Sequence, residues 1–584
     1  MNRVILTWVF ALIIVSVFGQ GLRNDGATIN VSAGAYFVLS GSAGNITLNS
    51  GVINLNGTLE LKGSFINNSS SSSLFGTVGA TSEIIFNGTD DQLIDGTTSY
   101  PFIFNDVTII SGAKVQVTAG KKMTTNGSFH NNGSFTLLAN STNDIATLKT
   151  DGSISGNGSC KIQAYLSTGR NWYLSSPIAN VKTDLFSTVY TYNEPTGTSA
   201  PWTTVANNTS TSMDIAKGYV VNVPADGVVT LSGGMFNNAA SSPTLTRTSG
   251  ETKEGFNLIG NPYPAYYDFS ATTKTDLMST YWYRTVNGSG NYVFETYNQG
   301  NNVGTGLSGK TVSNLIPPLQ AFWVRVNSGS TSGSFSFATA NRAYVDDANN
   351  KFRAPAESIV KYARLQIANG ANFDETIVAF NPNAFDSYDD YDSPKMSNTN
   401  ALIPEIYTKA GNEVVAINGL GAFSGEKYVP LGLNVSKTNT YTLKATEILG
   451  FDSSLQLFVL DKTDNNALHE LTAGQTFSFL SDSINTINRF EVIFKTSGSV
   501  TNVNKLSENQ VDLIRKDNQH LSVNYLGSID NYSNVSVYSV AGAVLASKKI
   551  NNSQTNISLP YLPGVYVLRV TVPGNRVTEK IIVK

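Results

Sequence analysis

Short apolar segments recur through residues 21–165 at a nearly constant spacing. The pieces NITL, VINL, TLEL and SFIN begin at residues 45, 52, 58 and 64, a stride of six to seven residues. Apolar and polar positions alternate within each piece, which is the period of a strand with one buried face. Gly and Asn stand between the pieces, where sharp corners need a positive φ. The residues expected to face inward are Ile46, Leu48, Ile53, Leu55, Leu59, Leu61 and Phe65.

This stride predicts a parallel β-helix-like solenoid over residues 20–165. In such a solenoid each rung buries its core against the next rung. NGSFHN at 126–131 is followed directly by NGSFTL at 132–137, which continues the repetition. A meandering antiparallel stack is the alternative, and we favour the solenoid. Asn-rich corners that stack as ladders account for the Asn content without any functional role.

Longer aromatic strands replace the short repeats over residues 166–350. They are NWYLSSP (171–177), GYVVNVP (218–224), EGFNLIGNPYP (254–264), TYWYRTV (280–286), NYVFETYN (291–298) and LIPPLQAFWVRV (315–326). Pro-rich turns at 261–264 and 316–318 exclude helix there. A third set of strands fills residues 351–498, including YARLQIA (362–368) and RFEVIF (489–494). We therefore expect one β-sandwich module over 166–350 and another over 351–498.

The last segment, residues 503–584, has the pattern of a small separate Ig-like β-sandwich. Apolar residues alternate around Tyr538, and turns follow at 541–542, 562–564 and 574–575. Several short strands with turns every 8–12 residues are typical of a sandwich. The polar stretch TSGSVTNVN at 496–504 is the expected linker before it.

Three pieces of this tail, VSVYSVAGAVL, LPYLPGVYVLRV and EKIIVK, occur in an order that resembles the type A sorting domain of the type IX secretion system of Bacteroidota. The matching positions are Gly542, Gly564, Tyr566, Lys580 and Lys584. The family's usual PNP segment is absent, and LIRKDNQHLSVN stands in its place. The resemblance implies recognition by the type IX machinery and export across the outer membrane. Cleavage near the linker, with attachment to the surface or release, is also implied.

The aromatic strands carry a second resemblance. The order WYLSSP, GYVV, GFNLIGNPYP and IPPLQAFWVRV is similar to an uncharacterised module common in Bacteroidota surface proteins. This resemblance brings no catalytic residues with it.

The N-terminus agrees with export. Arg3 precedes an apolar run at residues 4–18, with small residues near a cut before Gln20. This pattern predicts a secretory signal peptide at residues 1–19, because the run is short for a membrane-spanning helix. We find no other segment long and apolar enough to span a bilayer, so the mature chain is expected to be secreted or surface-attached.

Composition fits an exported all-β protein. Charged residues make up only 14% of the chain, while Gly, Tyr and Phe number 50, 26 and 29. A net charge of −3 gives no basic footprint for nucleic acid. The single Cys160 has no partner for an intrachain disulfide and is expected to be a buried small hydrophobe.

Candidate metal chemistry is confined to one acidic cluster, Asp386, Asp389, Asp390 and Asp392. Crowded carboxylates in a loop suit Ca²⁺, although the spacing differs from that of an EF-hand. The competing interpretation, which we favour, is a solvated acidic loop with Tyr388 and Tyr391 packed beneath it. The three His residues lie in three predicted domains without an HExxH or GxSxG motif, which argues against a zinc enzyme and a Ser-His-Asp hydrolase.

A glycosidase needs only two carboxylates, so this class stays open. Glu254, Asp268 and Glu295 lie among aromatic residues, as do Trp172, Trp202, Trp282 and Trp323. Aromatic residues at alternating strand positions more often form a sandwich core. We therefore expect a non-enzymatic, adhesin-like or matrix-like surface protein that contacts glycans or other cells. The alternative is a secreted carbohydrate-active enzyme or carbohydrate-binding protein.

Overall fold

The computed structural model describes residues 21–41, 44–70, 75–194, 201–250, 253–309, 312–344, 360–370, 372–471, 475–496, 511–515, 520–525, 533–539, 542–552, 554–558, 564–572 and 575–583. Within these ranges the chain forms strands and two short 3₁₀ turns but no α-helix, which confirms the all-β class. The predicted signal peptide lies outside the described residues. None of the described segments is a helix long and apolar enough to cross a membrane.

Two compact units divide the chain. The first comprises Met1–Val360 and Ile367–Gly421, and the second comprises Lys361–Gln366 and Ala422–Lys584. The first unit therefore combines the repetitive region, the aromatic strands and part of the region that follows. The predicted domain limits stay predictions.

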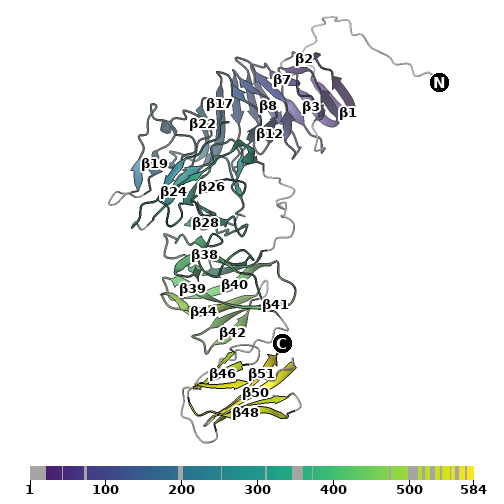
Figure 1. The fold of residues 1–584 in the computed structure, drawn as a ribbon. Coiled ribbons are helices and arrows are strands. Elements are labelled where there is room, and N and C mark those ends of the chain that lie inside the picture. Colours follow the sequence, from purple (N-terminus) through teal and green to yellow (C-terminus); the bar gives the residue numbers. More distant parts are fainter. Residues whose placement is uncertain are drawn as a thin grey trace, which may run out of the picture. The chain divides into compact units, whose positions relative to one another are not determined.

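The first unit opens with a parallel β-solenoid (Figure 1). Its strands are β1 (Leu22–Val31), β2 (Tyr36–Leu39), β3 (Ile46–Leu55), β4 (Thr58–Leu61), β5 (Phe65–Asn67), β6 (Phe75–Val78), β7 (Glu83–Phe86), β8 (Asp91–Asp95), β9 (Phe102–Phe104), β10 (Asp106–Ile109), β11 (Lys114–Val117), β12 (Lys122–Thr125), β13 (Phe129–Asn131), β14 (Ser134–Leu137), β15 (Thr147–Thr150), β16 (Ile154–Ser155) and β17 (Ser159–Leu166). They form three faces, in the orders β1-β3-β5-β8-β11-β14-β17, β2-β4-β7-β10-β13-β16 and β9-β12-β15, with β6 beside β3. All of these pairings are parallel, so the solenoid is confirmed over the antiparallel stack.

The register explains the short stride in the sequence. Thr108 pairs with His130, Lys114 with Ser134, and Met123 with Leu148, and across the solenoid a strand meets its partner 19 to 29 residues later. NITL and VINL lie in the two halves of β3, TLEL in β4 and SFIN in β5, so three strides complete the rung from Ile46 to Phe65.

The interior of the solenoid is apolar and densely aromatic. The seven residues expected to face inward are all at most 2% exposed, which confirms the prediction. The ring of Phe65 lies 5.7–6.3 Å, centroid to centroid, from the rings of Phe75, Phe102 and Phe104. This contiguous core supplies the buried area that stabilises the short strands.

Asn side chains of the solenoid bond from rung to rung. Asn49 Nδ2 donates to Asp25 Oδ1 at 2.8 Å, and Asn68 Nδ2 donates to Asn49 Oδ1 at 3.0 Å. Asn54 Nδ2 donates to Asn30 Oδ1 at 2.7 Å. The bonded residues lie mostly within β1 and β3 rather than at corners, and the bonds give their amides a structural role.

The aromatic module follows the solenoid directly. Its elements are β18 (Trp172–Leu174), η1 (Thr183–Leu185), β19 (Thr188–Tyr192), β20 (Trp202–Thr204), β21 (Tyr219–Asn222), β22 (Gly227–Gly233), β23 (Thr244–Thr246), β24 (Phe256–Gly260), β25 (Tyr266–Asp268), β26 (Lys274–Thr275), β27 (Thr280–Val286), β28 (Tyr292–Asn298), β29 (Val303–Gly304), β30 (Leu315–Ile316), β31 (Ala321–Arg325), β32 (Ser332–Phe335), η2 (Thr339–Asn341) and β33 (Arg342–Ala343). The longest sheet has the order β24-β31-β27-β28-β29. Aromatic side chains fill the core, among them Tyr263, Tyr267, Phe269, Tyr281, Tyr297, Phe322, Phe335 and Phe337.

Strand β22 of this module closes the last solenoid rung. It pairs antiparallel with β17 from Cys160 opposite Gly233 to Leu166 opposite Gly227. Cys160 is fully buried at this junction, as expected, and burial raises its pKa to about 11. The solenoid and the module therefore share one hydrophobic core.

Asn261 joins the two Pro-rich turns of the module. Its Nδ2 donates to the carbonyl oxygens of Ala265, Ile316 and Pro317 at 2.8, 3.2 and 2.9 Å. Leu319, which ends the second turn, has a φ of 64°. The buried Asn261 side chain thus supplies the hydrogen bonds that connect the two turns.

Residues 367–421 pack on the aromatic module within the first unit. Their strands are β35 (Phe373–Phe380), β36 (Ser393–Pro394), β37 (Glu405–Ala410) and β38 (Glu413–Leu420), while β34 (Lys361–Ala368) begins in the second unit. Trp282 Nε1 donates to the Pro394 oxygen at 3.1 Å, and Asn298 Nδ2 donates to Ser393 Oγ at 3.1 Å. These residues therefore contact the aromatic module through buried side chains, and the predicted module limits stay predictions.

The second unit contains longer antiparallel strands and then the tail. Its remaining strands are β39 (Glu426–Val435), β40 (Asn439–Leu449), β41 (Leu455–Asp461), β42 (Ala467–Glu470), β43 (Thr476–Ser481), β44 (Ile484–Thr496), β45 (Val511–Arg515), β46 (His520–Tyr525), β47 (Asn534–Ser539), β48 (Val544–Lys549), β49 (Gln554–Ser558), β50 (Gly564–Val572) and β51 (Asn575–Val583). The tail has two sheets, β45-β46-β49 and β48-β47-β50-β51. Val523, Val535, Val537 and Val570 are fully buried between them. The tail is the small β-sandwich that the pattern predicted.

Candidate binding cavity in the first unit

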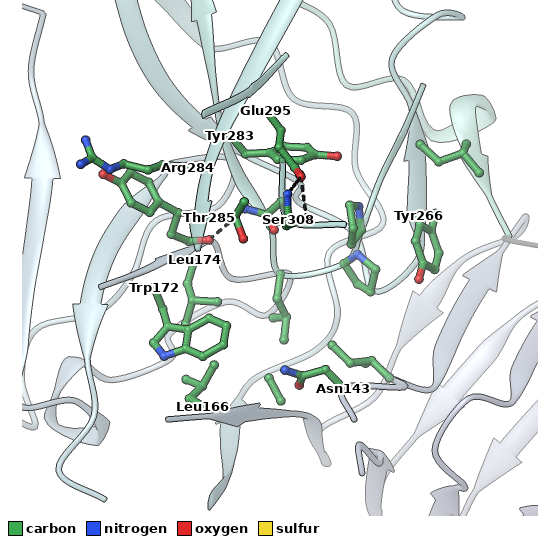
Figure 2. A pocket seen from close by; sticks show the side chains of 18 of the residues that line it. Asn143, Leu166, Trp172, Leu174, Tyr266, Tyr283, Arg284, Thr285, Glu295 and Ser308 are labelled. Carbon is green, nitrogen blue, oxygen red and sulfur yellow. Dashed lines mark hydrogen bonds between the residues drawn. The ribbon is translucent and has the colours of Figure 1, made fainter. Parts of the chain in front are cut away.

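A cavity of about 430 Å³ opens where the last solenoid rung meets the aromatic module. The solenoid contributes Asn143, Ile145, Ala164 and Leu166 to its lining. The module contributes Arg170, Trp172, Tyr173, Leu174, Tyr266, Tyr283, Arg284, Thr285, Glu295, Ser308, Ser313, Leu315, Pro317, Pro318, Leu319 and Gln320. Figure 2 shows Trp172, Leu166 and Asn143 on one side, with Tyr283, Glu295 and Ser308 across from them.

Trp172 is the main aromatic surface on the first side. Its Nε1 donates to the Ser167 oxygen at 3.0 Å, which fixes the indole. The guanidinium carbon of Arg170 lies 3.8 Å from the centre of the ring. Burial lowers the pKa of Arg170, and its buried Nε has no hydrogen-bond partner within the part of the chain that the structure describes. A cation and an aromatic face are therefore held together at the cavity wall.

Glu295 anchors the opposite side. It is 3% exposed, and its Oε1 accepts hydrogen bonds from Ser308 N at 2.8 Å and Ser308 Oγ at 2.6 Å. Tyr283 stands beside it in the lining, and burial raises the pKa of Tyr283 well above its usual value. Both groups are thus present in fixed positions, with the phenol neutral at any physiological pH.

Arg284 adds a second positive charge to the lining. Its guanidinium carbon lies 5.1 Å from the ring centre of Tyr292 and 5.0 Å from that of Phe294. Its Nη2 donates to Thr399 Oγ1 at 2.8 Å. The cavity therefore combines aromatic faces, two guanidinium groups and amide or hydroxyl groups. This is the mixture that binds polar small molecules with apolar faces.

Of the three carboxylates that the sequence singled out, one lines the cavity. Glu295 is that residue. Glu254 pairs with Arg247 and accepts from Gly250 N at 2.5 Å. Asp268 accepts from Ser270 Oγ at 2.6 Å and Asn314 Nδ2 at 2.7 Å. The structure gives each of the three a structural bonding partner.

The four Trp residues divide between core and surface. Trp282 is fully buried and Trp323 is 5% exposed, so both belong to the core. Trp202 is 39% exposed and packs edge-on against Tyr192 and Trp323. Only Trp172 of the four lines this cavity.

The acidic loop is held by backbone donors. Asp392 is fully buried, and its two oxygens accept from Asp389 N and Gly419 N at 2.9 Å each. Asp389 accepts from Phe385 N and Tyr391 N, and Asp386 accepts from Gly421 N at 3.2 Å. Among the described residues, no group of three or more His, Cys, Asp or Glu is arranged to hold a metal ion. Calcium binding by this loop stays a prediction.

A second cavity of about 430 Å³ touches the acidic loop. Asp389, Asp390 and Tyr388 line it with Glu413 and two cations, Arg247 and Arg325. Burial lowers the pKa of Arg325 and raises that of Asp390. Asp392 is thus buried within the loop, whereas Asp389 and Asp390 line a cavity that also carries two arginines.

Sequence patterns did not reveal most of the first cavity's polar lining. Arg170 directly precedes the segment NWYLSSP, and a cation next to an aromatic strand was the available signal. Asn143 and Gln320 carry no such signal, because they meet only through the solenoid–module junction.

Of the described sorting-motif residues, two lie at a turn or strand start of the tail and two lie within strands. Gly542 has a φ of 89° in the turn between β47 and β48, and Gly564 begins β50. Tyr566 pairs with Ser539 and Ile581, and Lys580 pairs with Val567. Lys584 lies outside the described residues.

Two family models match this chain. One, described as a domain of unknown function (DUF8693), covers residues 76–494. The other, described as a secretion system C-terminal sorting domain, covers residues 516–584. No curated protein matches the chain. The second match confirms the resemblance of the tail to a type IX sorting domain: the protein is exported through the outer membrane to the cell surface or beyond.

Proposed function

Since the chain belongs to the family described as a domain of unknown function (DUF8693) and carries a type IX sorting domain, we propose that it acts outside the cell as an adhesin-like glycan-binding protein. The first cavity is the proposed binding site. Its ligand is a short stretch of carbohydrate on another cell or in the surrounding matrix.

The arrangement of Trp172 and Arg170 is the observation that supports this proposal. A sugar ring presents an apolar C–H face and a rim of hydroxyl groups. The indole of Trp172 offers a flat surface for the face, and Arg170 Nε is a buried donor without a partner in the described structure. Asn143 and Gln320 also line the cavity, where their amide nitrogens donate to backbone oxygens of Tyr165, Tyr173 and Ala321. A bound hydroxyl oxygen would relieve the unsatisfied donor, which otherwise costs free energy.

The same lining favours binding over hydrolysis. Glycosidases use a pair of carboxyl groups on either side of the scissile bond. Among the described residues that line this cavity, Glu295 is the sole carboxylate, and it is bonded to Ser308. We therefore propose a protein without glycosidase activity.

A glycan array with the purified chain, followed by calorimetry on the hits, tests the proposal. Trp172→Ala is expected to weaken binding at least about fivefold, since an aromatic stacking contact contributes about 1 kcal/mol beyond its buried area. Trp202→Ala is the matched control, because Trp202 lies outside the cavity and is 39% exposed. Equal losses in both variants, or no binding by the parent protein, would contradict the proposed site.

The enzyme alternative has its own readout. Each bound glycan is incubated with the parent protein and with Glu295→Gln, which keeps an oxygen for Ser308. Turnover by the parent protein that Glu295→Gln abolishes would overturn the non-enzymatic proposal while leaving the binding site in place.

A further inference from the structure

Lys395 and Asp374 form a deeply buried ion pair in the first unit. Lys395 Nζ lies 2.6 Å from Asp374 Oδ2, and the two side chains are 5% and 1% exposed. Lys395 directly follows β36, and Asp374 is the second residue of β35. Desolvating two opposite charges at this depth is unfavourable, so an ion pair is a weak source of stability for joining these two segments.

The two oxygens of Asp374 have different environments. Oδ2 accepts a hydrogen bond from Ile406 N at 2.8 Å, in addition to its contact with Lys395. Oδ1 is buried and has no hydrogen-bond partner among the described residues. Oδ2 therefore accepts a hydrogen bond from a backbone N–H, whereas Oδ1 accepts none from the described residues.

The segment that carries Lys395 is fixed on both sides of the pair. Lys395 N donates to the Val414 oxygen at 2.9 Å, and Asn398 N donates to Glu405 Oε1 at 2.6 Å. Glu405 immediately precedes Ile406, whose N–H holds Asp374. Glu405 is thus a positioning residue that ties the lysine segment to the strand that orients the carboxyl group. Such fixed proximity raises the effective concentration of two reacting groups by many orders of magnitude.

We propose that Lys395 and Asp374 are a site of covalent self-modification, joined in the mature protein by an isopeptide bond. Proton transfer within the pair leaves a neutral amine and a carboxylic acid. The Nζ lone pair attacks Cγ and the N–C bond forms; the carboxyl proton and one proton of the attacking amine pass to Oδ1, and the C–Oδ1 bond breaks with release of water. The ammonium and the carboxylate together yield one neutral amide and one water, so atoms and charge balance without any co-reactant.

The local contacts support each part of this step. Ile406 N–H faces Oδ2, where negative charge develops when the amine adds to Cγ. Oδ1, which leaves as water, has no described bond to break. The product is a neutral amide in place of two buried charges, and its oxygen keeps the hydrogen bond from Ile406 N–H. The second product, water, is released to bulk solvent.

The bond would close a covalent ring over residues 374–395. That ring contains the acidic loop with Asp386 to Asp392 and the residues that pack on Trp282 and Asn298. In a chain with a single Cys160 it would supply the covalent tie that a disulfide gives other exported proteins. This inference is independent of glycan binding.

Intact mass spectrometry of the full purified chain tests the proposal. The parent protein is expected to be lighter than its sequence by one water. Lys395→Arg is the matched control, because it keeps the positive charge but provides no amine, and it should have the mass of its sequence. A parent mass equal to its sequence would overturn the proposal. So would a water loss that persists in Lys395→Arg, since an aspartate can also lose water by cyclising on its own backbone.

Peptide mapping locates the bond. Trypsin cleaves after Arg364, Lys395 and Lys409 in an unmodified chain, so it separates residues 365–395 from 396–409. An acylated Lys395 resists cleavage, and the expected product is a single peptide of residues 365–409, one water lighter. A second cut between 374 and 395 should leave its two fragments joined. Separation of those fragments would contradict the assignment to Asp374 and Lys395.

Discussion

At the scale of single residues, Asp392 is the group whose chemistry the fold changes most clearly. Burial raises its pKa to about 7 from 3.8, although backbone bonds from Asp389 and Gly419 act in the opposite direction. The folded state therefore binds this proton more tightly than the unfolded chain does. The resulting stabilisation is fully present below the unfolded pKa and is lost as the pH rises through about 7.

The free energy of unfolding of the first unit is accordingly expected to fall between about pH 5 and about pH 8, by on the order of a few kcal/mol. Urea denaturation at the two pH values measures it. Asp392→Asn should lower stability at both, because its amide nitrogen cannot accept a backbone N–H, but the difference between the two pH values should vanish. Asp226→Asn is the control, since hydrogen bonds from Thr168 lower the pKa of that exposed carboxyl out of the tested range. An unchanged pH dependence in Asp392→Asn would contradict the assignment.

At the scale of elements, the solenoid depends on glycine at corners where two rungs approach closely. Gly96 has a φ of 136°, and a Cβ at this position would lie 1.8 Å from the Asn67 oxygen. Gly112 also has a positive φ, of 83°, but a Cβ there would meet nothing within 4 Å. Substitutions at the two positions therefore distinguish the steric cost of a close contact between rungs from the cost of an unfavourable backbone angle.

Gly96→Ala is expected to destabilise the first unit by about 3 kcal/mol or more, because backbone atoms of the neighbouring rung must move. Gly112→Ala should cost only about 1–2 kcal/mol, the usual strain of a left-handed non-glycine residue. Calorimetric melting of both variants beside the parent protein gives the comparison. Equal losses would show that contact between the rungs is not the limiting factor.

Most of the fold at this scale was predictable from the sequence. Alternation at residues 45–66 identified the inward face of the solenoid, because period-2 burial is a local property of each strand. The size of a rung was not predictable from the stride alone, since the stride is the length of one face and the number of faces depends on how the chain closes. The packing of residues 367–421 on the aromatic module also has no local signature. It rests on contacts such as Trp282 to Pro394, over a hundred residues apart.

The candidate site was predictable only in part for the same reason. Trp172 and Glu295 were recognisable as an aromatic and a carboxylate in the right region. Their shared cavity arises because the turn at Asn143 and the Pro-rich turn before Gln320 meet across the junction of β17 and β22. A sequence pattern records neither that junction nor the buried donor on Arg170.

At the scale of the whole molecule, the tail determines where the protein works. It folds around its own valine-rich core, and the sorting-domain match spans residues 516–584. Export therefore depends on a segment outside residues 76–494, which the larger family match covers.

Deletion of residues 503–584 is expected to leave the protein in the periplasm, since the outer-membrane machinery then has no domain to recognise. Fractionation of the producing cells with an antibody against the first unit measures this, with the full chain as the reference. A truncated chain that still reached the surface or the medium would show that the tail is dispensable for export.

The antiparallel cap of β22 on β17 has one more consequence. The hydrogen bonds described for β4, β7 and β8 stay within the solenoid, whereas β12 and β15 also bond to the aromatic module through Thr124 and Thr150. A turn of 19 to 29 residues can therefore be inserted or removed between β4 and β8 without altering β17, β22 or the cavity they border. The length of the solenoid can therefore change while its junction with β22 stays the same. Relatives with more or fewer repeats would keep the same cavity while placing β1 at a different distance from it.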